Sequence, residues 1–259
     1  MRRLVFMAGA TAAVAGAAVW VRRSRGAASA DVPGALPGRV GTRVNAWMHR
    51  PVYALMAAAL DLRSDDDLLD VGCGSGDFLA EHASHVGRVA GLDLSEPKVG
   101  IAQRRLADRI AAGTAEIVKG DAGALPWEDG RFTAVTSMDA FPFFPDPERA
   151  LSEMHRVLRP DGRAVMGFGW KVPEGTKTHT VMGGFRVWDE TDVRRMTEEA
   201  GFADVAISYG RAGGDSRLLN LLGRLWGSVE ARVVRGVKPP LAADSPVSVT
   251  PSLVGRGAG

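Results

Sequence analysis

The chain has 259 residues, 46% of them hydrophobic and 24% charged, so it is long and apolar enough to bury a core of its own. Its net charge of +2 is unevenly distributed, because residues 1–30 carry five Arg and no acidic residue, and residues 211–259 carry six Arg, one Lys and three acidic residues. The middle of the chain is therefore acidic, which argues against nucleic acid as a partner. A single cysteine, Cys73, excludes an internal disulfide and, with only five His, disfavours a zinc site.

An uncharged, mostly apolar run covers residues 4–21, with arginines on both flanks. Three interpretations remain open. The run just reaches the length of a membrane anchor. A cleavable signal peptide would end at Ala28-Ser29-Ala30, although three arginines precede that site. In the third interpretation the start codon of the protein lies downstream of this run. We take 1–30 as an N-terminal apolar segment and 31–42 as a linker. If the domain that follows uses a cytosolic metabolite, it would face the cytoplasm.

Helix and strand patterns alternate through the expected domain at residues 43–238, which predicts a parallel, doubly wound α/β sheet. A Gly-rich loop is expected at 171–184, an amphipathic helix within 210–227, and a disordered tail at 239–259. The expected helices are 44–62, 77–85, 96–110 (capped by Ser95), 147–158 and 190–200, and the expected strands are 67–71, 89–93, 115–119, 132–138, 163–168, 203–209 and 229–237.

The segment Asp70–Gly76, with the sequence DVGCGSG, follows a strand and opens a helix. Gly72 and Gly74 would leave room for a ligand against the backbone, and Gly76 would let the next helix start close to the strand. A Gly-rich turn alone is typical of many nucleotide folds. The ligand class therefore depends on further features.

Two features favour a sulfonium nucleoside over a dinucleotide. The glycines follow a G-x-G-x-G spacing, and Asp77 would oppose an anion at the helix start, where dinucleotide folds bind pyrophosphate. Asp93 ends the next strand, 21 residues after Gly72, where a carboxylate accepts hydrogen bonds from ribose hydroxyls. A nicotinamide oxidoreductase is correspondingly disfavoured.

With these residues the sequence resembles the class I S-adenosylmethionine-dependent methyltransferases, and most of all their small-molecule branch of quinone- and lipid-type enzymes. The motifs that carry the resemblance are Leu68–Gly76, Val89–Ser95, Gly120-Asp121-Ala122 with Leu125-Pro126, and Glu153–Gly162, within about residues 45–210. The resemblance implies a Rossmann-like, mostly parallel seven-stranded sheet with an antiparallel last strand.

The resemblance also implies the roles of individual residues toward S-adenosylmethionine. Glu153, Arg156 and Arg159 would hold a helix and turn together rather than contact the ligand. The residues implied to bind the donor are Gly72, Cys73 and Gly74 around the methionine moiety, Asp70 as support of the loop, Asp93 on the ribose, Leu94 against the adenine, Asp121 and Ala122 on the adenine edge, and Met138 near the methionine.

The expected function is in-line methyl transfer to a small, apolar acceptor. The rate acceleration would come mainly from holding donor and acceptor close together and aligned. No catalytic residue is assigned; the candidates for contact with the acceptor are Asp139, His49 and Tyr53. The phenylalanines at 141, 143 and 144 form either an acceptor wall or part of the core. A catalytically silent, donor-binding regulatory protein is the alternative. Neither the acceptor nor the oligomeric state follows from the sequence.

Overall fold

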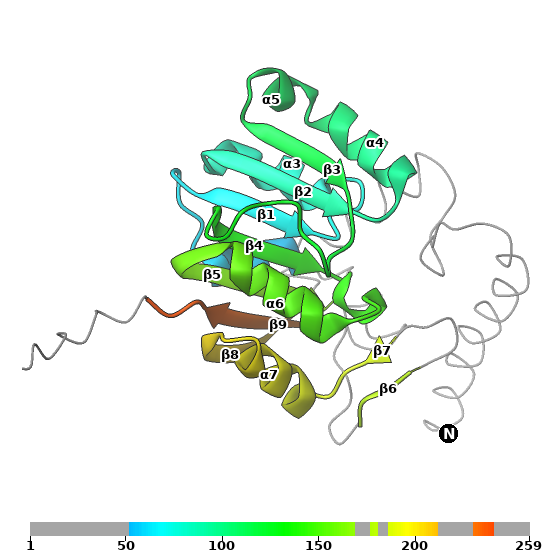
Figure 1. Ribbon diagram of the computed structural model, residues 1–259, viewed down its shortest axis with the longest axis vertical. Coiled ribbons are helices and arrows are strands. Elements are labelled where there is room, and N and C mark those ends of the chain that lie inside the picture. Colours follow the sequence, from blue (N-terminus) through cyan, green and yellow to red (C-terminus); the bar gives the residue numbers. More distant parts are fainter. Residues whose placement is uncertain (1–51, 169–176, 181–185, 212–229, 241–259) are drawn as a thin grey trace, which may run out of the picture.

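The computed structural model describes residues 52–168, 177–180, 186–211 and 230–240. Its centre is a seven-stranded sheet with the order β3-β2-β1-β4-β5-β9-β8 (Figure 1). Neighbouring strands pair in parallel except for β9, which is antiparallel to both β5 and β8. The strands are β1 (Asp67–Val71), β2 (Arg88–Asp93), β3 (Ala115–Lys119), β4 (Phe132–Met138), β5 (Leu158–Phe168), β8 (Ala203–Arg211) and β9 (Glu230–Val237), and a separate pair joins β6 (His179–Thr180) to β7 (Arg186–Val187). The predicted fold, with its antiparallel last strand, is confirmed.

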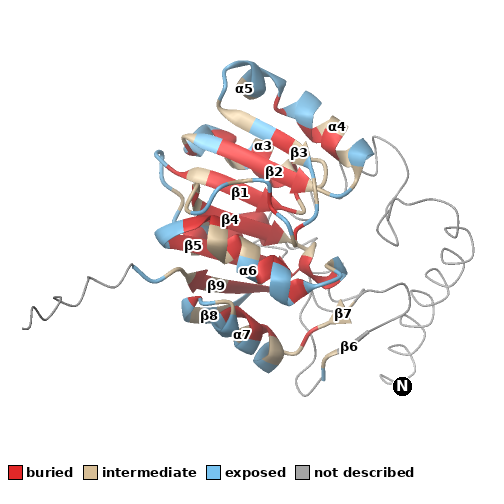
Figure 2. Ribbon diagram, viewed as in Figure 1, coloured by how far each residue is buried: buried red, intermediate tan, exposed pale blue. Residues whose placement is uncertain are grey.

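Helices cover both faces of the sheet, and their buried sides meet the buried strands (Figure 2). One face carries a helical segment at residues 52–60 together with α3 and α4, and the other carries α6 and α7. The bounds are α3 (Asp77–His82), α4 (Glu96–Arg105), α5 (Ala107–Ala111), α6 (Pro147–Val157) and α7 (Glu190–Glu199), with 3-10 turns η1 (Ala83–His85) and η2 (Phe141–Phe143).

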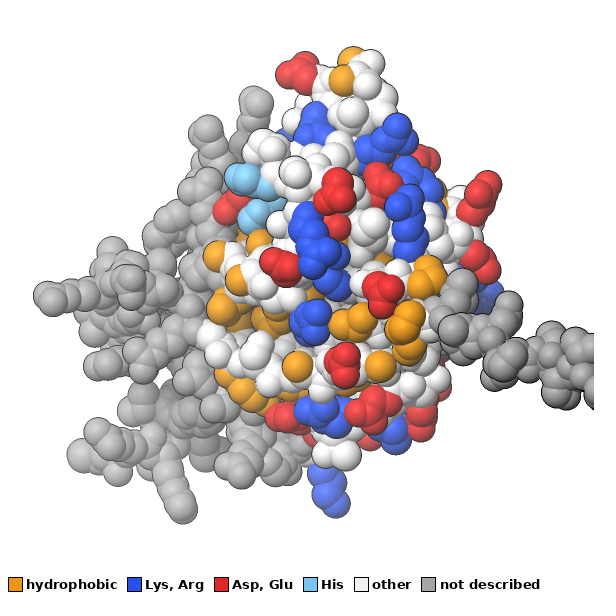
Figure 3. All heavy atoms as spheres, turned by 90° about the vertical axis from the view of Figure 1, so that its left-hand side faces the viewer, with side chains coloured by type: hydrophobic (Ala, Val, Ile, Leu, Met, Phe, Trp, Pro, Cys, Tyr) orange, Lys and Arg blue, Asp and Glu red, His pale blue; other side chains and the backbone are white. Residues whose placement is uncertain are grey.

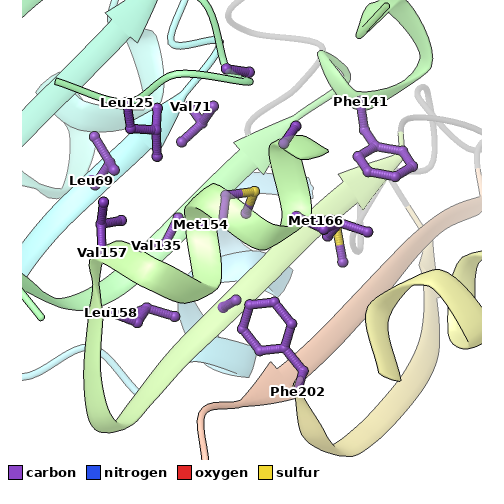
Figure 4. Packing of buried hydrophobic residues seen from close by; sticks show 14 of the residues in the cluster. Leu69, Val71, Leu125, Val135, Phe141, Met154, Val157, Leu158, Met166 and Phe202 are labelled. Carbon is purple, nitrogen blue, oxygen red and sulfur yellow. The ribbon is translucent and has the colours of Figure 1, made fainter. Parts of the chain in front are cut away.

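Two apolar clusters fill these two faces. The cluster under α6 and α7 runs from Phe141, near the tips of β4 and β5, to Phe202 at its other end (Figure 4). The cluster on the opposite face packs Met56, Phe78 and Leu79 against the sheet. Both faces of the central strands are therefore buried, as is usual for parallel sheets.

The register brings the carboxyl ends of β1, β2, β3 and β4 to one edge. Asp70 is aligned with Gly91 on one side and with Thr136 on the other, so the loops after these strands start close together. Figure 3 shows the opposite edge, where acidic and basic side chains are mixed. The edge with the carboxyl ends is where ligands bind in open α/β sheets.

Two predicted boundaries and one predicted cap are wrong. The helix expected at 96–110 breaks at Leu106, whose side chain is buried, while α5 beyond it buries no residue. The strand expected at 163–168 already starts at Leu158. Ser95 precedes α4 as expected, but its hydroxyl makes no capping hydrogen bond; its N–H donates to Asp93 Oδ1 at 2.9 Å. The remaining expected elements match within two residues, except that η1 ends the helix expected at 77–85, and the short elements η2, β6 and β7 were not expected.

Several predictions fall on residues outside the described ranges. These are the apolar run at 4–21, the linker, residues 44–51 of the first helix, the helix expected within 210–227, and the tail from 241. Among the residues that the structure does describe, no helix has the length and apolar character needed to cross a membrane.

A buried ion pair joins the first helix to the sheet. Arg163 donates to Asp66 Oδ2 at 2.6 Å and to the Leu60 carbonyl oxygen at 2.6 Å, and both charged side chains are almost fully buried. Asp66 Oδ1 also accepts from Thr133 Oγ1 at 2.6 Å. Removal of either charge would leave the other buried and unpaired.

We expect Asp66→Ala to lower the free energy of unfolding by about 3–5 kcal/mol, because it leaves the Arg163 charge unpaired in the interior. Urea denaturation followed by circular dichroism measures this change. Glu199→Ala, which breaks the exposed Arg195–Glu199 pair, is the matched control and should cost about 1 kcal/mol or less. Similar losses of unfolding free energy in the two variants would contradict the role assigned to the buried Asp66–Arg163 pair.

Candidate donor-binding site

The loop between β1 and α3 contains three glycines in the left-handed region, with φ of 78° at Gly72, 54° at Gly74 and 71° at Gly76. The N–H groups of Gly72 and Cys73 both donate to the Leu92 carbonyl oxygen, at 2.7 and 3.0 Å. These hydrogen bonds tie the loop to the end of β2. The left-handed backbone of the loop would cost conformational free energy if residues other than glycine stood at these positions.

Each glycine meets a different environment. A Cβ at Gly72 would lie 2.3 Å from the Cβ of Ala140, and one at Gly76 would lie 3.0 Å from the Cβ of Ala102 in α4. A Cβ at Gly74 would have no atom of the described residues within 4 Å. Gly74 thus borders open space, as expected for a ligand site. At Gly72 and Gly76 a side chain would meet Ala140 and α4 of this same chain, a constraint that the sequence analysis did not predict, whereas the room that Gly72 would leave for a ligand stays a prediction.

Both oxygens of Asp93 accept backbone hydrogen bonds. Oδ2 accepts from Gly74 N at 2.8 Å and Oδ1 from Ser95 N at 2.9 Å. The carboxylate therefore links the Gly-rich loop to the start of α4. Each carboxylate oxygen has a second lone pair available for a ribose hydroxyl. Leu94, beside it, is 68% exposed and presents an apolar surface at the same edge.

The loop after β3 adds a hollow to this edge. Asp121 Oδ1 accepts from Gly123 N at 2.9 Å, and Ala122 is buried in the core cluster. A cavity of about 270 Å³ borders this loop and is lined by Asp121, Gly123, Ala124, Phe144, Pro145, Asp146 and Arg149. Asp121 and Ala122, predicted to bind the adenine, thus lie at or next to a space that a planar group could enter.

Asp70 lies beneath the loop, fully buried, and its Oδ1 accepts from Thr136 Oγ1 at 2.9 Å. Burial, and then the nearby charge of Asp93, raise the pKa of Asp70 to about 7, although the hydrogen bond from Thr136 opposes the rise. Asp70 therefore changes charge near neutral pH. This property was not visible in the sequence, where Asp70 was expected only to support the loop.

Cys73 and Met138 turn their side chains toward the second apolar cluster. The Cys73 thiol packs so closely over Gly91 that a Cβ there would lie 2.9 Å from Sγ. Burial, followed by the charges of Asp70 and Asp93, raises the pKa of the thiol. The thiol is therefore a buried, uncharged group, and it donates to the Gly74 carbonyl oxygen at 3.8 Å. Met138 is half-buried beside Met56 and Gly167.

Arg105 is a site residue that the sequence analysis missed. It donates to the Ser75 carbonyl oxygen at 2.9 Å and pairs with Asp77 Oδ1 at 2.5 Å, so it joins the Gly-rich loop to α4. This pair partly offsets the charge of Asp77, which weakens the argument that Asp77 opposes an anion at the helix start. No sequence motif relates Arg105 to Asp77, which lies 28 residues earlier in the chain.

Tyr53 is buried at this edge with its ring edge-on to Phe78, the centroids 5.5 Å apart. Burial, and then the charges of Asp77, Asp70 and Asp139, raise the pKa of its hydroxyl. Asp139 directly follows β4 in the left-handed region, at φ 50°, and its N–H donates to the Gly167 carbonyl oxygen at 2.9 Å. The structure thus brings Tyr53 and Asp139 near the donor loop, whereas His49 lies outside the described residues.

The three phenylalanines after β4 have different surroundings. Phe141 is fully buried, Phe144 is half-buried and lines the cavity, and Phe143 is 38% exposed. Phe141 therefore belongs to the core, and Phe144 borders the cavity beside Asp121, whereas the acceptor wall stays a prediction.

Glu153 and Arg156 hold the turn before β4, as predicted. Glu153 Oε2 accepts from Leu125 N at 2.8 Å, and Arg156 donates to Glu153 and to the carbonyl oxygens of Leu125 and Trp127. Within the described ranges, no group of three His, Cys, Asp or Glu residues could hold a metal ion.

The strand order, the antiparallel last strand and the Gly-rich loop after β1 define the class I S-adenosylmethionine-dependent methyltransferase fold. Residues 69–166 match the family model described as "Methyltransferase domain". The chain therefore contains a methyltransferase domain of this class.

Two curated relatives illustrate the match. The nocamycin O-methyltransferase of Saccharothrix syringae is 36% identical over 53% of this chain and 49% of its own length. The demethylmenaquinone methyltransferase of Lactiplantibacillus plantarum is 33% identical over 49% of this chain and 55% of its own. The chain thus spans about half the length of these relatives.

A solved structure agrees on the fold. The phosphoethanolamine N-methyltransferase 2 of Haemonchus contortus, in complex with S-adenosylhomocysteine, superposes with a TM-score of 0.60 at 17% identity, over 77% of this chain and 58% of that one.

We expect Asp70→Asn to gain stability relative to the parent as the pH rises from about 4 to about 7. Over this range the unfolded parent ionises Asp70 while the folded parent keeps it protonated, because its pKa is raised to about 7, so the stability of the parent falls. Asn stays neutral in both states and still accepts from Thr136. Urea unfolding at a series of pH values measures the difference. Asp108→Asn, at an exposed position of α5, is the control. Parallel pH profiles for Asp70→Asn and the parent would contradict the raised pKa.

Proposed function

We propose that the chain is an S-adenosylmethionine-dependent methyltransferase that acts on a small acceptor with apolar surface. The observation that carries the proposal is the open space at Gly74, beside the Asp93 carboxylate, which holds the loop through one oxygen and the start of α4 through the other. The two relatives described above are methyltransferases named after small molecules, which supports a small molecule as the acceptor.

The residues present fit the donor. Asp93 would accept from the ribose hydroxyls, and the backbone from Gly72 to Gly74 would lie along the methionine moiety. Leu94 would cover the adenine, with Asp121 and Ala122 on its edge and Met138 on the methionine side. When bound, S-adenosylmethionine supplies a methyl group on a positively charged sulfur. Asp70 sits below the loop, where its ionised form would favour that charge.

The acceptor would approach over the ends of β4 and β5. Phe144 offers it an apolar surface, and Asp139 offers a carboxylate at the strand end. The chain would align the acceptor atom opposite the donor sulfur and exclude water. The methyl–sulfur bond of the bound donor would break as the bond to the acceptor atom forms, the sulfur would keep the electron pair, and the Asp139 carboxylate would accept any proton that the acceptor atom loses. Such alignment supplies about 7–11 kcal/mol of barrier reduction.

Asp93→Ala should weaken binding of S-adenosylmethionine about tenfold or more, because it leaves the ribose hydroxyls without their charged partner. Titration calorimetry with S-adenosylmethionine, S-adenosylhomocysteine and NAD measures which of these ligands binds and how much affinity the variant loses. Asp108→Asn is again the control and should bind as the parent does. Binding of NAD alone would overturn the proposal. Donor binding without methyl transfer to any acceptor would favour the regulatory alternative.

We also propose that residues 4–21 anchor the protein to a membrane, with the methyltransferase domain on the cytoplasmic side where the donor is made. The full chain should then sediment with membranes and resist extraction by high salt, whereas a chain without residues 1–30 should stay in the supernatant. Recovery of both forms in the supernatant would contradict an anchor.

A further inference from the structure

Two buried aspartates lie at opposite ends of β1, and only one of them has a cation beside it. Asp66, just before the strand, and Asp70, near its carboxyl end, are each 2% exposed. Asp66 Oδ1 accepts from Thr133 Oγ1 at 2.6 Å, and Asp70 Oδ1 accepts from Thr136 Oγ1 at 2.9 Å. Arg163 pairs with Asp66 at 2.6 Å, whereas no cation of the described residues pairs with Asp70.

The two carboxyl groups therefore ionise differently. Burial favours the neutral form of both. At Asp66 the hydrogen bonds and the ion pair with Arg163 outweigh burial, so its pKa is lowered. At Asp70 burial, with the charge of Asp93, prevails over the hydrogen bond from Thr136 and raises the pKa to about 7. A positive charge brought close to Asp70 would supply what Arg163 supplies to Asp66.

Asp70 responds to charge at the open edge of the donor loop. It is aligned with Gly91 of β2, and Asp93, two residues further along that strand, lies on the same face of the sheet. Asp93 Oδ2 accepts from Gly74 N at 2.8 Å, and a Cβ at Gly74 would have no atom of the described residues within 4 Å. A cation in that open space would therefore act on Asp70 as Asp93 does, with the opposite sign, and without touching it.

Among the described residues, the ionisable groups around Asp70 bring it no positive charge. Burial, and then carboxylates that include Asp70, raise the pKa of Tyr53 and of Cys73, so both stay uncharged at neutral pH. Arg105 is held by Asp77, and Lys98 acts on Cys73 but is not among the charges that act on Asp70. The groups around it on the first helix, the loop, α3, α4 and the strand ends are Tyr53, Cys73, Asp77, Glu81, Asp93, Lys98, Arg105 and Asp139.

We propose that Asp70 gives up its proton when S-adenosylmethionine binds and takes a proton back when S-adenosylhomocysteine replaces it. This inference rests on the proposed function and adds a means by which the site distinguishes donor from product. The two ligands differ by the methyl group and the positive charge on sulfur, and only the charged form favours the Asp70 carboxylate. The proton passes to the solvent on donor binding, and one returns from the solvent once the charge on sulfur is gone.

The first test counts protons. The full chain and Asp70→Asn are titrated with each ligand at about pH 7, by calorimetry in buffers of different ionisation enthalpy. With S-adenosylmethionine the parent should release up to about half a proton more than Asp70→Asn, because about half of its Asp70 side chains are protonated at this pH. With S-adenosylhomocysteine the two proteins should agree. Protons of the ligands themselves are common to both proteins and cancel in the comparison.

The second test follows affinity with pH. Between about pH 6 and about pH 8, the preference for S-adenosylmethionine over S-adenosylhomocysteine should rise about fivefold more in the parent than in Asp70→Asn, because ionisation of Asp70 strengthens only donor binding. Thr136→Val removes the hydrogen bond that favours the ionised form, so it should move this rise to higher pH. The exposed variant Asp108→Asn should behave as the parent does. A purely structural role of Asp70 would leave the pH of the rise unchanged in Thr136→Val.

Equal proton release with S-adenosylmethionine in the parent and in Asp70→Asn would overturn the inference. If Asp70→Asn fails to fold, Thr136→Val decides, since an unshifted pH profile in that variant also overturns it. Binding of both ligands without these differences would leave the methyltransferase proposal standing. Binding of neither ligand by the parent would overturn both proposals.

Discussion

The candidate site depends on one carboxylate, that of Asp93, which holds two backbone segments at once. Its Oδ2 accepts from Gly74 and its Oδ1 from Ser95, so the Gly-rich loop and the start of α4 have a fixed separation. A loop with three left-handed glycines has much conformational freedom to lose. The Asp93 contacts and the Leu92 carbonyl restrict that freedom before any ligand binds.

The sequence predicted the fold and the position of the donor loop, because these depend on local patterns. Apolar runs of five to seven residues, glycines at fixed spacing and an acidic residue at the end of β2 can all be recognised in the amino-acid sequence. The break of the long helix at Leu106 was not predicted, since neither Gly nor Pro marks it and the cause is burial in the core. The raised pKa of Asp70 likewise depends on burial and on a neighbour in the next strand.

The contacts that the sequence analysis missed all join distant parts of the chain. Arg105 reaches Asp77 across 28 residues, and Arg232 reaches Trp188 across 44. Neither partner belongs to a motif, so spacing gave no signal. The motifs thus indicated the donor loop, whereas contacts between distant residues, such as those that line the cavity beside Phe144, are visible only in the folded chain.

The sheet itself separates the two apolar clusters. The cluster that contains Phe141, Phe168 and Trp188 lies on one face, and the cluster that contains Cys73, Phe78 and Met56 lies on the other. Changes at sites that share no neighbours act independently. A lineage with this architecture is therefore free to repack the face under α6 and α7 while the packing of Cys73 beneath the Gly-rich loop stays intact.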